Sequence, residues 1–173
     1  MTSFSITKYI EIDAAHRVPD TKSMCRNIHG HRYKIEATVL GPLSQEGPEK
    51  GMVTDFSFLK EGMMSIIHGY CDHAMILQIT DPFVKVWCDP DRIIHYQSYL
   101  PEEIFSTYGT YLGDGLNLYL IGKTPTAENL AEHWFHRLGP DVMSVSKNRV
   151  WLERIIVHET ASCSATYEGE KKE

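Results

Sequence analysis

The sequence predicts an α+β fold in which two helices cover one face of an antiparallel four-stranded sheet. Two stretches near each end of the chain alternate between apolar and polar residues, which is typical of half-buried strands. Two stretches between them carry apolar residues at helical spacing. Because neighbouring strands connect as hairpins, this order gives an antiparallel sheet with both helices on one face. Such a sheet keeps open edges, and several copies can close it by joining edge to edge into a barrel.

The first two predicted strands bring three histidines to one face. Residues 4–12 form the first strand, in which apolar side chains occupy most even positions, and His16 keeps this parity. In the second strand the odd positions are apolar from Tyr33 onwards, and His29 and His31 share that parity. If the two strands pair as a hairpin, the three imidazoles converge on the apolar face.

These histidines suit a metal ion. Three neutral imidazoles that leave a fourth position open are typical of a catalytic zinc site. A His-x-His pair alone often occurs without a metal, and the third histidine of matching parity strengthens the case. The sequence therefore predicts a zinc site at His16, His29 and His31, with an incidental cluster as the alternative.

The first helix is predicted to begin after Asp55, whose carboxylate can accept the free amide protons of the first turn. Apolar residues follow at helical spacing over residues 59–70. Asp72 and His73 come directly after this helix, and the aspartate could orient the imidazole for proton transfer. Adjacent Asp–His pairs are more often surface residues, so that interpretation stays open as well.

The middle of the chain is harder to assign. An aspartate followed by a proline predicts a short helix over residues 81–87, and glycines bound a predicted strand over residues 116–121. Residues 88–115 include several aromatic side chains but show no clear period. We interpret this stretch as an excursion that covers the domain or contacts another subunit.

The second helix is predicted over residues 124–138 and ends at a Gly-Pro pair. Its apolar stripe is typical of a helix that lies on a sheet. His133 and His136 fall outside the stripe, so we expect both to face solvent.

Two further strands end the chain, over residues 150–159 and 162–167. In the first of them Trp151, Ile155 and Val157 share the inward parity, and so does Glu159. A carboxylate on the inward side of a strand is costly unless something pairs with it. Glu159 is therefore a candidate for binding a ligand.

The composition is that of one globular domain over residues 1–173, with 42% hydrophobic and 23% charged residues. A net charge of −6 implies no general affinity for nucleic acid. There is no apolar run of membrane-spanning length and no signal-peptide pattern, so we expect a cytoplasmic protein. The cysteines have no C-x-x-C spacing and are expected to be free thiols: Cys25, Cys71, Cys88 and Cys163.

Two motifs resemble those of a known family. Residues 25–31 read Cys-x-x-x-His-Gly-His, and residues 125–131 read Pro-Thr-Ala-Glu-Asn-Leu-Ala. Both resemble the family of 6-pyruvoyl-tetrahydropterin synthases and 6-carboxytetrahydropterin synthases. Four further stretches match in the family's order and extend the resemblance over nearly the whole chain: residues 15–17, 51–56, 72–73 and 158–160.

The resemblance implies the tunnelling fold (T-fold), in which trimers close an antiparallel barrel and two trimers stack into a homohexamer. It implies Zn²⁺ on His16, His29 and His31, and the small molecule 7,8-dihydroneopterin triphosphate as substrate. No nucleic acid or membrane partner is expected.

The resemblance also implies roles for single residues. Cys25 would be the catalytic thiol, with Asp72 and His73 as its partners in proton transfer. Glu159 would anchor the pterin ring, and Thr126 would lie near the pterin across a subunit boundary. A buried structural thiol is the alternative for Cys25, because free cysteine often packs as a small hydrophobic residue.

The spacing within the first motif favours one branch of the family. Three residues separate Cys25 from His29, as in the queuosine-pathway branch, whereas the animal branch has a longer gap. We therefore expect a lyase that forms 6-carboxytetrahydropterin, acetaldehyde and triphosphate. A 6-pyruvoyl-tetrahydropterin synthase is the first alternative, and a pterin- and zinc-binding protein without turnover is the second.

Overall fold

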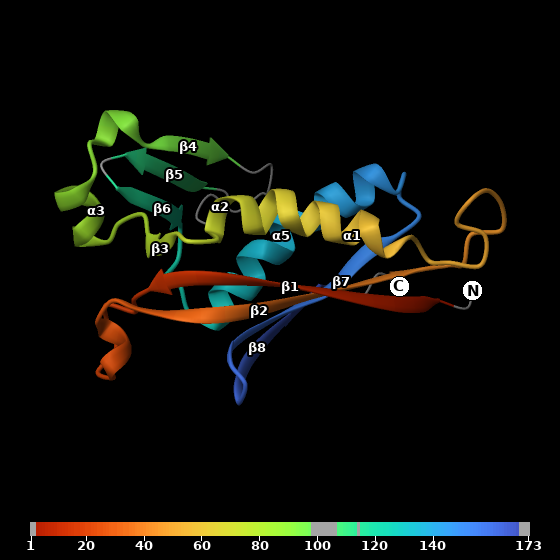
Figure 1. Cartoon of the computed structure of the whole chain (residues 1–173), viewed down its shortest axis with the longest axis horizontal. Coiled ribbons are helices and arrows are strands. Elements are labelled where there is room, and N and C mark those ends of the chain that lie inside the picture. The colour runs from red at the N-terminus through yellow and green to blue at the C-terminus, as the bar shows by residue number, and fades with distance from the viewer. Residues whose placement is uncertain (1–2, 98–106, 114, 170–173) are drawn as a thin grey trace.

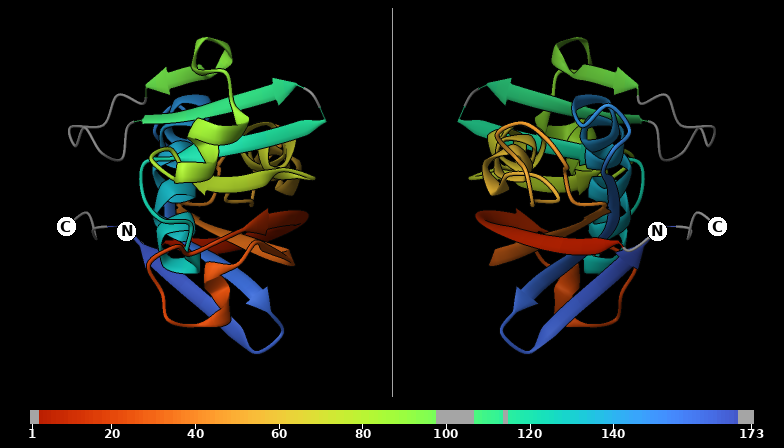
Figure 2. Two further views of the ribbon diagram at one scale, coloured as in Figure 1. Left: turned by 90° about the vertical axis from the view of Figure 1, so that its left-hand side faces the viewer. Right: turned by 90° about the vertical axis from the view of Figure 1, so that its right-hand side faces the viewer.

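The structure is a computed structural model that describes residues 3–97, 107–113 and 115–169. Within these ranges, eight strands form one sheet in the order β4-β5-β6-β3-β1-β2-β7-β8. The two long helical segments, around α1 and around α5, lie on the same side of β1 and β2 (Figure 1). The sheet is strongly twisted, and in Figure 2 it runs from β4 at the top to the β7–β8 hairpin at the bottom.

The four strands that the sequence predicts form the antiparallel part of this sheet. They are β1 (Phe4–His16), β2 (His29–Gly41), β7 (Trp151–Thr160) and β8 (Cys163–Glu168). β1 and β2 pair over their full length, from Phe4 opposite Gly41 to His16 opposite His29. The predicted α+β class and its first hairpin are confirmed.

A bulge in β7 changes which residues of that strand face the core. The register between β2 and β7 shifts by one residue here, so Val39 lies opposite Leu152. Leu152 is buried, whereas Trp151 is only half-buried. The predicted inward parity therefore holds for Ile155 and Val157 but is wrong for Trp151, because a bulge inserts one residue into the alternation.

The first helical segment follows Asp55, as predicted. The Asp55 carboxylate accepts the amide proton of Ser57 at 2.7 Å and caps α1 (Phe56–Met63). The segment continues through a π-helical turn, η2 (Met64–His68), and the short α2 (Gly69–Cys71). Its apolar face packs on the inner face of β1 and β2 and forms the main core with α5.

The second helix, α5 (Ala127–Val145), is longer than predicted and passes through Pro140. Proline inside a helix removes one backbone hydrogen bond and usually ends or kinks it. Here Leu138 and Val142, on either side of Pro140, are both buried in the core. Their burial outweighs the lost hydrogen bond, so the expected end of the helix at the Gly-Pro pair is wrong.

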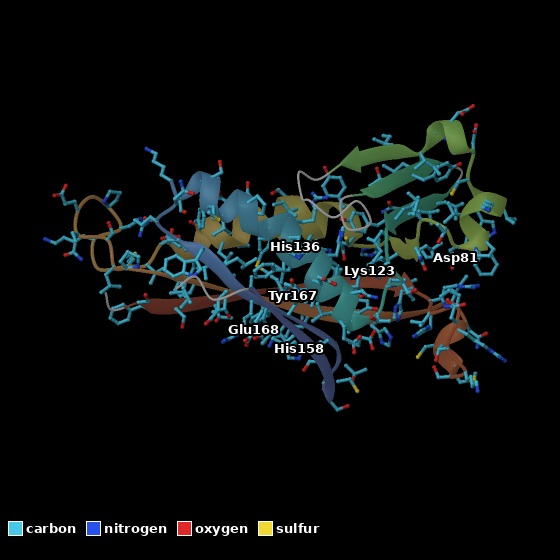
Figure 3. The ribbon with its side chains drawn as sticks, turned by 180° about the vertical axis from the view of Figure 1, so that it is seen from behind. Asp81, Lys123, His136, His158, Tyr167 and Glu168 are labelled. Atoms are coloured by element: carbon cyan, nitrogen blue, oxygen red, sulfur yellow. The ribbon has the colours of Figure 1, made fainter. Side chains whose placement is uncertain are left out.

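The two histidines of α5 are not solvent-facing. His133 is buried, and its Nε2 lies 2.7 Å from the hydroxyl of Tyr119 on β6 (Leu116–Ile121). Burial lowers the pKa of His133 to about 3 and keeps the ring neutral. His136 is half-buried beside Tyr167, with 3.2 Å between Nε2 and Oη (Figure 3). The prediction fails for His133 because β6, which lies outside the predicted four-stranded sheet, supplies Tyr119, and for His136 because Tyr167 of β8 reaches it.

The middle of the chain adds further strands to the sheet. The added elements are β3 (Met75–Gln78), α3 (Pro82–Trp87), η3 (Pro90–Arg92), β4 (Ile94–Gln97), β5 (Thr107–Gly113) and β6. β4, β5 and β6 pair antiparallel, and β6 pairs parallel with β3. The predicted helix at 81–87 and strand at 116–121 are confirmed, while β4 and β5 lie in the stretch expected to be an excursion. Parts of that stretch, residues 98–106 and 114, lie outside the described residues.

An ion pair attaches α3 to the end of β1. The Arg17 Nε lies 3.0 Å from Oδ2 of Asp81, whose side chain is almost completely buried. The other carboxylate oxygen of Asp81 caps α3 by accepting the amide proton of Phe83, and the Arg17 guanidinium lies 4.4 Å from the centre of the Phe83 ring. The residue after His16 is thus fixed to the middle segment.

The antiparallel part of the sheet keeps two open edges among the described residues. β3 pairs with β1 only at Ala15 and His16, so the rest of that edge of β1 has no partner strand in this part of the chain. β8 forms the opposite edge. Within the described ranges, none of the helices has the length and apolarity needed to cross a membrane.

Candidate metal centre and adjoining cavities

The β1–β2 pairing places the three predicted ligands together. His16 ends β1 and lies opposite His29 at the start of β2, and Ala14 lies opposite His31. All three imidazoles therefore point to the same face of the sheet, and one ring nitrogen of each lies within 4.8 Å of the others. These are the three histidines that share the apolar parity of the two strands in the sequence.

Backbone carbonyls set the tautomers of two of these rings. The His16 Nδ1 lies 2.6 Å from the carbonyl oxygen of Pro125, and the His29 Nδ1 lies 2.8 Å from that of Asn27. A carbonyl only accepts, so each Nδ1 carries the proton and each Nε2 is left with a bare lone pair. The two Nε2 atoms are 3.2 Å apart. Two lone pairs at this distance repel each other unless a cation lies beside them.

The third ring completes the fit to a metal ion. The His31 Nε2 is buried and has no hydrogen-bond partner among the described residues. Burial lowers the pKa of His16, which is 1% exposed, and favours the neutral form that binds metals. Three converging imidazoles, two of them with a free lone pair on the facing nitrogen, suit Zn²⁺, which prefers such ligands in a tetrahedral arrangement.

A cavity of about 270 Å³ adjoins this cluster, and half of the predicted site residues line it. His16, Cys25, Thr126 and Glu159 line it. The Glu159 Oε1 lies 3.7 Å from the His16 Nε2, and the carboxylate is a quarter exposed. The cavity therefore combines a thiol, a carboxylate and an imidazole of the candidate metal centre.

Cys25 lies on η1 (Met24–Arg26), in the loop between β1 and β2. Ser23 Oγ accepts the amide proton of Cys25 at 3.2 Å, and the Cys25 carbonyl accepts that of Val18 at 2.8 Å. These bonds hold the loop beside the end of β1. Cys25 is exposed, so the alternative of a buried structural thiol is wrong.

Thr126 lines the same cavity within one chain, next to the cluster. It is the N-cap of α5, and its hydroxyl accepts the amide proton of Asn129 at 3.3 Å. The sequence missed one neighbour, Cys163, which is exposed and lines this cavity as well. Hydroxyls of Thr160 and Ser162 lower the pKa of the Cys163 thiol. Its place at the start of β8, just beyond the strand that carries Glu159, is the signal that points to the cavity.

Asp72 and His73 do not line the cavity of Cys25. The Asp72 Oδ2 is 2.9 Å from the His73 Nδ1, and Oδ1 accepts the amide proton of Asp13 at 3.0 Å. Burial opposes ionisation of Asp72, but these hydrogen bonds outweigh it and lower the carboxyl pKa. His73 has a positive φ of 56° and lines a second cavity of about 590 Å³ together with Arg32. One chain therefore does not bring His73 into the cavity of Cys25.

In its fold, the chain is a T-fold protein. It belongs to the 6-pyruvoyl tetrahydropterin synthase family, whose model matches residues 5–170.

Curated relatives extend over most of the chain. The chain is 31% identical over 149 residues to a 6-carboxy-5,6,7,8-tetrahydropterin synthase of Haemophilus influenzae, covering 86% of this chain and 92% of the relative. It is 28% identical to a protein of the same name from Rickettsia bellii, covering 91% and 94% of the two chains.

Solved structures show the same fold. An uncharacterized protein from Wolinella succinogenes superposes with a TM-score of 0.75 at 21% identity, covering 98% of this chain and 100% of the other. The 6-pyruvoyl tetrahydropterin synthase of Plasmodium vivax has a TM-score of 0.66 at 16% identity, with 99% and 100% coverage.

Proposed function

We propose that this protein is a zinc-dependent 6-carboxy-5,6,7,8-tetrahydropterin synthase. It would convert 7,8-dihydroneopterin triphosphate to 6-carboxytetrahydropterin, acetaldehyde and triphosphate, in the route to queuosine. The observation that supports this most is the shared cavity of Cys25, Glu159 and His16. The names of the bacterial relatives and the short spacing from Cys25 to His29 favour the carboxy product.

In this proposal Glu159 holds the pterin ring. A carboxylate can accept two hydrogen bonds from adjacent N–H groups, and a pterin ring presents such a pair. Glu159 is partly buried at the cavity wall, beside the His16 ring. A ring bound there places its three-carbon side chain toward the histidine cluster. Pairing with a ligand also explains why a carboxylate occupies the inward parity of β7.

The three histidines would hold the zinc ion, and Cys25 would take the first proton. Zinc bound there supplies Lewis acidity, which makes a C–H bond next to a side-chain hydroxyl more acidic. Cys25 lines the same cavity as Glu159 of β7, on a loop that hydrogen bonds fix to the end of β1. A general base must come within hydrogen-bond reach of the proton that it removes, and Cys25 shares its cavity with His16 and Glu159.

A second chain would complete the proton transfer. His73, oriented by an ionised Asp72, is a suitable acid–base pair, but it lines a different cavity from Cys25. We propose that a neighbouring copy brings its His73 to the Cys25 cavity. The open edges of β1 and β8 give a route to this contact, since edge-to-edge pairing of copies would close the sheet into a barrel.

The assembly is testable in solution. We expect a homohexamer, because each site then receives groups from more than one chain and the sheet edges are paired. Light scattering at micromolar concentration should give six times the 19.8 kDa mass of one chain. A monomer at that concentration would contradict both the barrel and the shared site.

Turnover separates the proposed enzyme from a protein that only binds pterin and zinc. Zinc-loaded protein mixed with 7,8-dihydroneopterin triphosphate should change the pterin absorbance with time. A binding protein would shift the spectrum once, in proportion to its own concentration, and then stop. The 6-pyruvoyl alternative shares the first proton abstraction, so only the product distinguishes it.

A further inference from the structure

We infer that Thr124, Asn129 and Gln78 are positioning residues for His16. They hold the Pro125 carbonyl in the place where it fixes the tautomer and the orientation of the His16 ring. The inference deepens the proposed function, on which it rests, because the ring is positioned for binding a metal ion.

The first step is the contact between Pro125 and His16. The Pro125 carbonyl oxygen lies 2.6 Å from the His16 Nδ1, and both residues are buried. The carbonyl must accept this hydrogen bond, so the proton sits on Nδ1 and the lone pair of Nε2 faces the cluster. Whatever places this carbonyl therefore also places the metal-facing nitrogen of His16.

The second step is the turn that presents the carbonyl. The Thr124 carbonyl accepts two hydrogen bonds, one from the amide of Thr126 and one from the side-chain Nδ2 of Asn129, both at 2.8 Å. Pro125 stands between the two threonines, and its ring restricts φ. The pair of donors on Thr124 closes a tight turn around Pro125, which leaves the Pro125 carbonyl directed at His16.

The third step connects the turn to the strand beside His16. The Thr124 hydroxyl donates to Oε1 of Gln78 at 3.0 Å. Gln78 ends β3, and β3 pairs with β1 at His16 itself, which lies opposite Ile76. His16 and the carbonyl that orients it are thus both attached to β3. Thr124 and Pro125 lie in the segment between β6 and α5, in which Figure 3 labels the neighbouring residue Lys123.

This arrangement gives a role to a motif residue that the proposed reaction leaves unused. Asn129 is the asparagine of the Pro-Thr-Ala-Glu-Asn-Leu-Ala motif, and its side chain points back to the turn rather than into the cavity. Residues that hydrogen-bond to a metal ligand orient it, and their removal commonly weakens metal binding by about 10- to 100-fold. A rearranged Pro125 carbonyl would let the His16 ring rotate or adopt the other tautomer.

Four variants separate positioning from general stability. Thr124→Val removes the hydroxyl with little change in shape, and Thr124→Ser keeps it. Asn129→Ala removes the donor to the Thr124 carbonyl. Glu132→Gln is the matched control, because it breaks the 2.9 Å ion pair between Lys123 and Glu132. This ion pair also attaches the segment between β6 and α5 to α5, but neither of its residues belongs to the turn around Pro125.

The measurement is the affinity of each apo protein for Zn²⁺, by competition with a chromophoric chelator. Thr124→Val and Asn129→Ala should bind about 10- to 100-fold more weakly, whereas Thr124→Ser and Glu132→Gln should bind like the wild type. Co²⁺ in place of Zn²⁺ should show an altered visible spectrum in the first two variants only, because its absorption reports the coordination geometry.

Thermal unfolding of the apo proteins provides the control on folding. Unchanged zinc affinity in Thr124→Val and Asn129→Ala, or a loss that only follows unfolding at the assay temperature, would overturn the inference and leave the proposed function intact. Wild-type protein that takes up no zinc would contradict both.

Discussion

Replacing Cys25 by alanine should abolish turnover and leave zinc and pterin binding intact. The thiol is the only group in the proposed scheme that removes the first proton, and alanine cannot accept one. Loss of a general base typically costs about 10²- to 10⁴-fold in rate. Among the described residues, no hydrogen bond joins the thiol to the histidine cluster or to Glu159. His16 and His29 bond to the backbone carbonyls of Pro125 and Asn27, and Glu159 lies beside the His16 ring. Steady-state rates, zinc content and pterin affinity test these statements separately.

Cys163→Ala is the matched control for this variant. Cys163 is also an exposed thiol and lines the same cavity, but it lies on β8 rather than on the loop of Cys25. It should keep its activity. A fully active Cys25→Ala protein would remove the thiol from the mechanism, and an inactive Cys163→Ala protein would move the proton acceptor to β8.

Replacement of His29 or His31 by alanine should remove the bound zinc. The wild-type chain is expected to hold about one Zn²⁺ with three imidazole ligands and one open position. Two imidazoles alone bind far more weakly, and no further histidine, cysteine or carboxylate joins the three histidines in this cluster among the described residues. Metal analysis after gel filtration gives the stoichiometry. With the zinc gone, the proposed activity should be lost as well.

His158→Ala is the control for the histidine variants. His158 precedes Glu159 on β7 (Figure 3), but its Nε2 lies 3.3 Å from Glu36 and its side chain is on the other face of the strand from Glu159. Its zinc content should equal that of the wild type. Full zinc retention in both His29→Ala and His31→Ala would show that these histidines are not the zinc ligands.

Parts of the fold that depend on local spacing could be predicted from the sequence. The alternation in β1 and β2 predicts the hairpin, and the hairpin register brings His16 opposite His29. The capping residues Asp55 and Asp81 predict the starts of α1 and α3 for the same kind of local reason. Each of these statements needs only the geometry of neighbouring residues.

Features that depend on distant contacts could not be predicted in the same way. Burial of Val142 carries α5 past Pro140, and Tyr119 from β6 gives His133 a buried partner. β4 contains only the four residues Ile94–Gln97, too short to show an alternation. Likewise, no spacing along the chain shows that Cys25 and His73 line different cavities, because this depends on how β3 meets β1.

We propose that this chain cuts the pterin side chain to a carboxylate. Both branches of the family begin with the same substrate and the same proton abstraction, and they differ after triphosphate leaves. One keeps a three-carbon pyruvoyl group, and the other releases acetaldehyde. Three residues lie between Cys25 and His29, and Cys25 lines one cavity with His16 of the histidine cluster.

Trapping of acetaldehyde, combined with the mass of the pterin product, distinguishes the two outcomes. Zinc-loaded protein and 7,8-dihydroneopterin triphosphate should yield one acetaldehyde and one 6-carboxytetrahydropterin for each substrate consumed. A three-carbon pterin product without acetaldehyde would contradict the proposed function and assign the chain to the pyruvoyl branch.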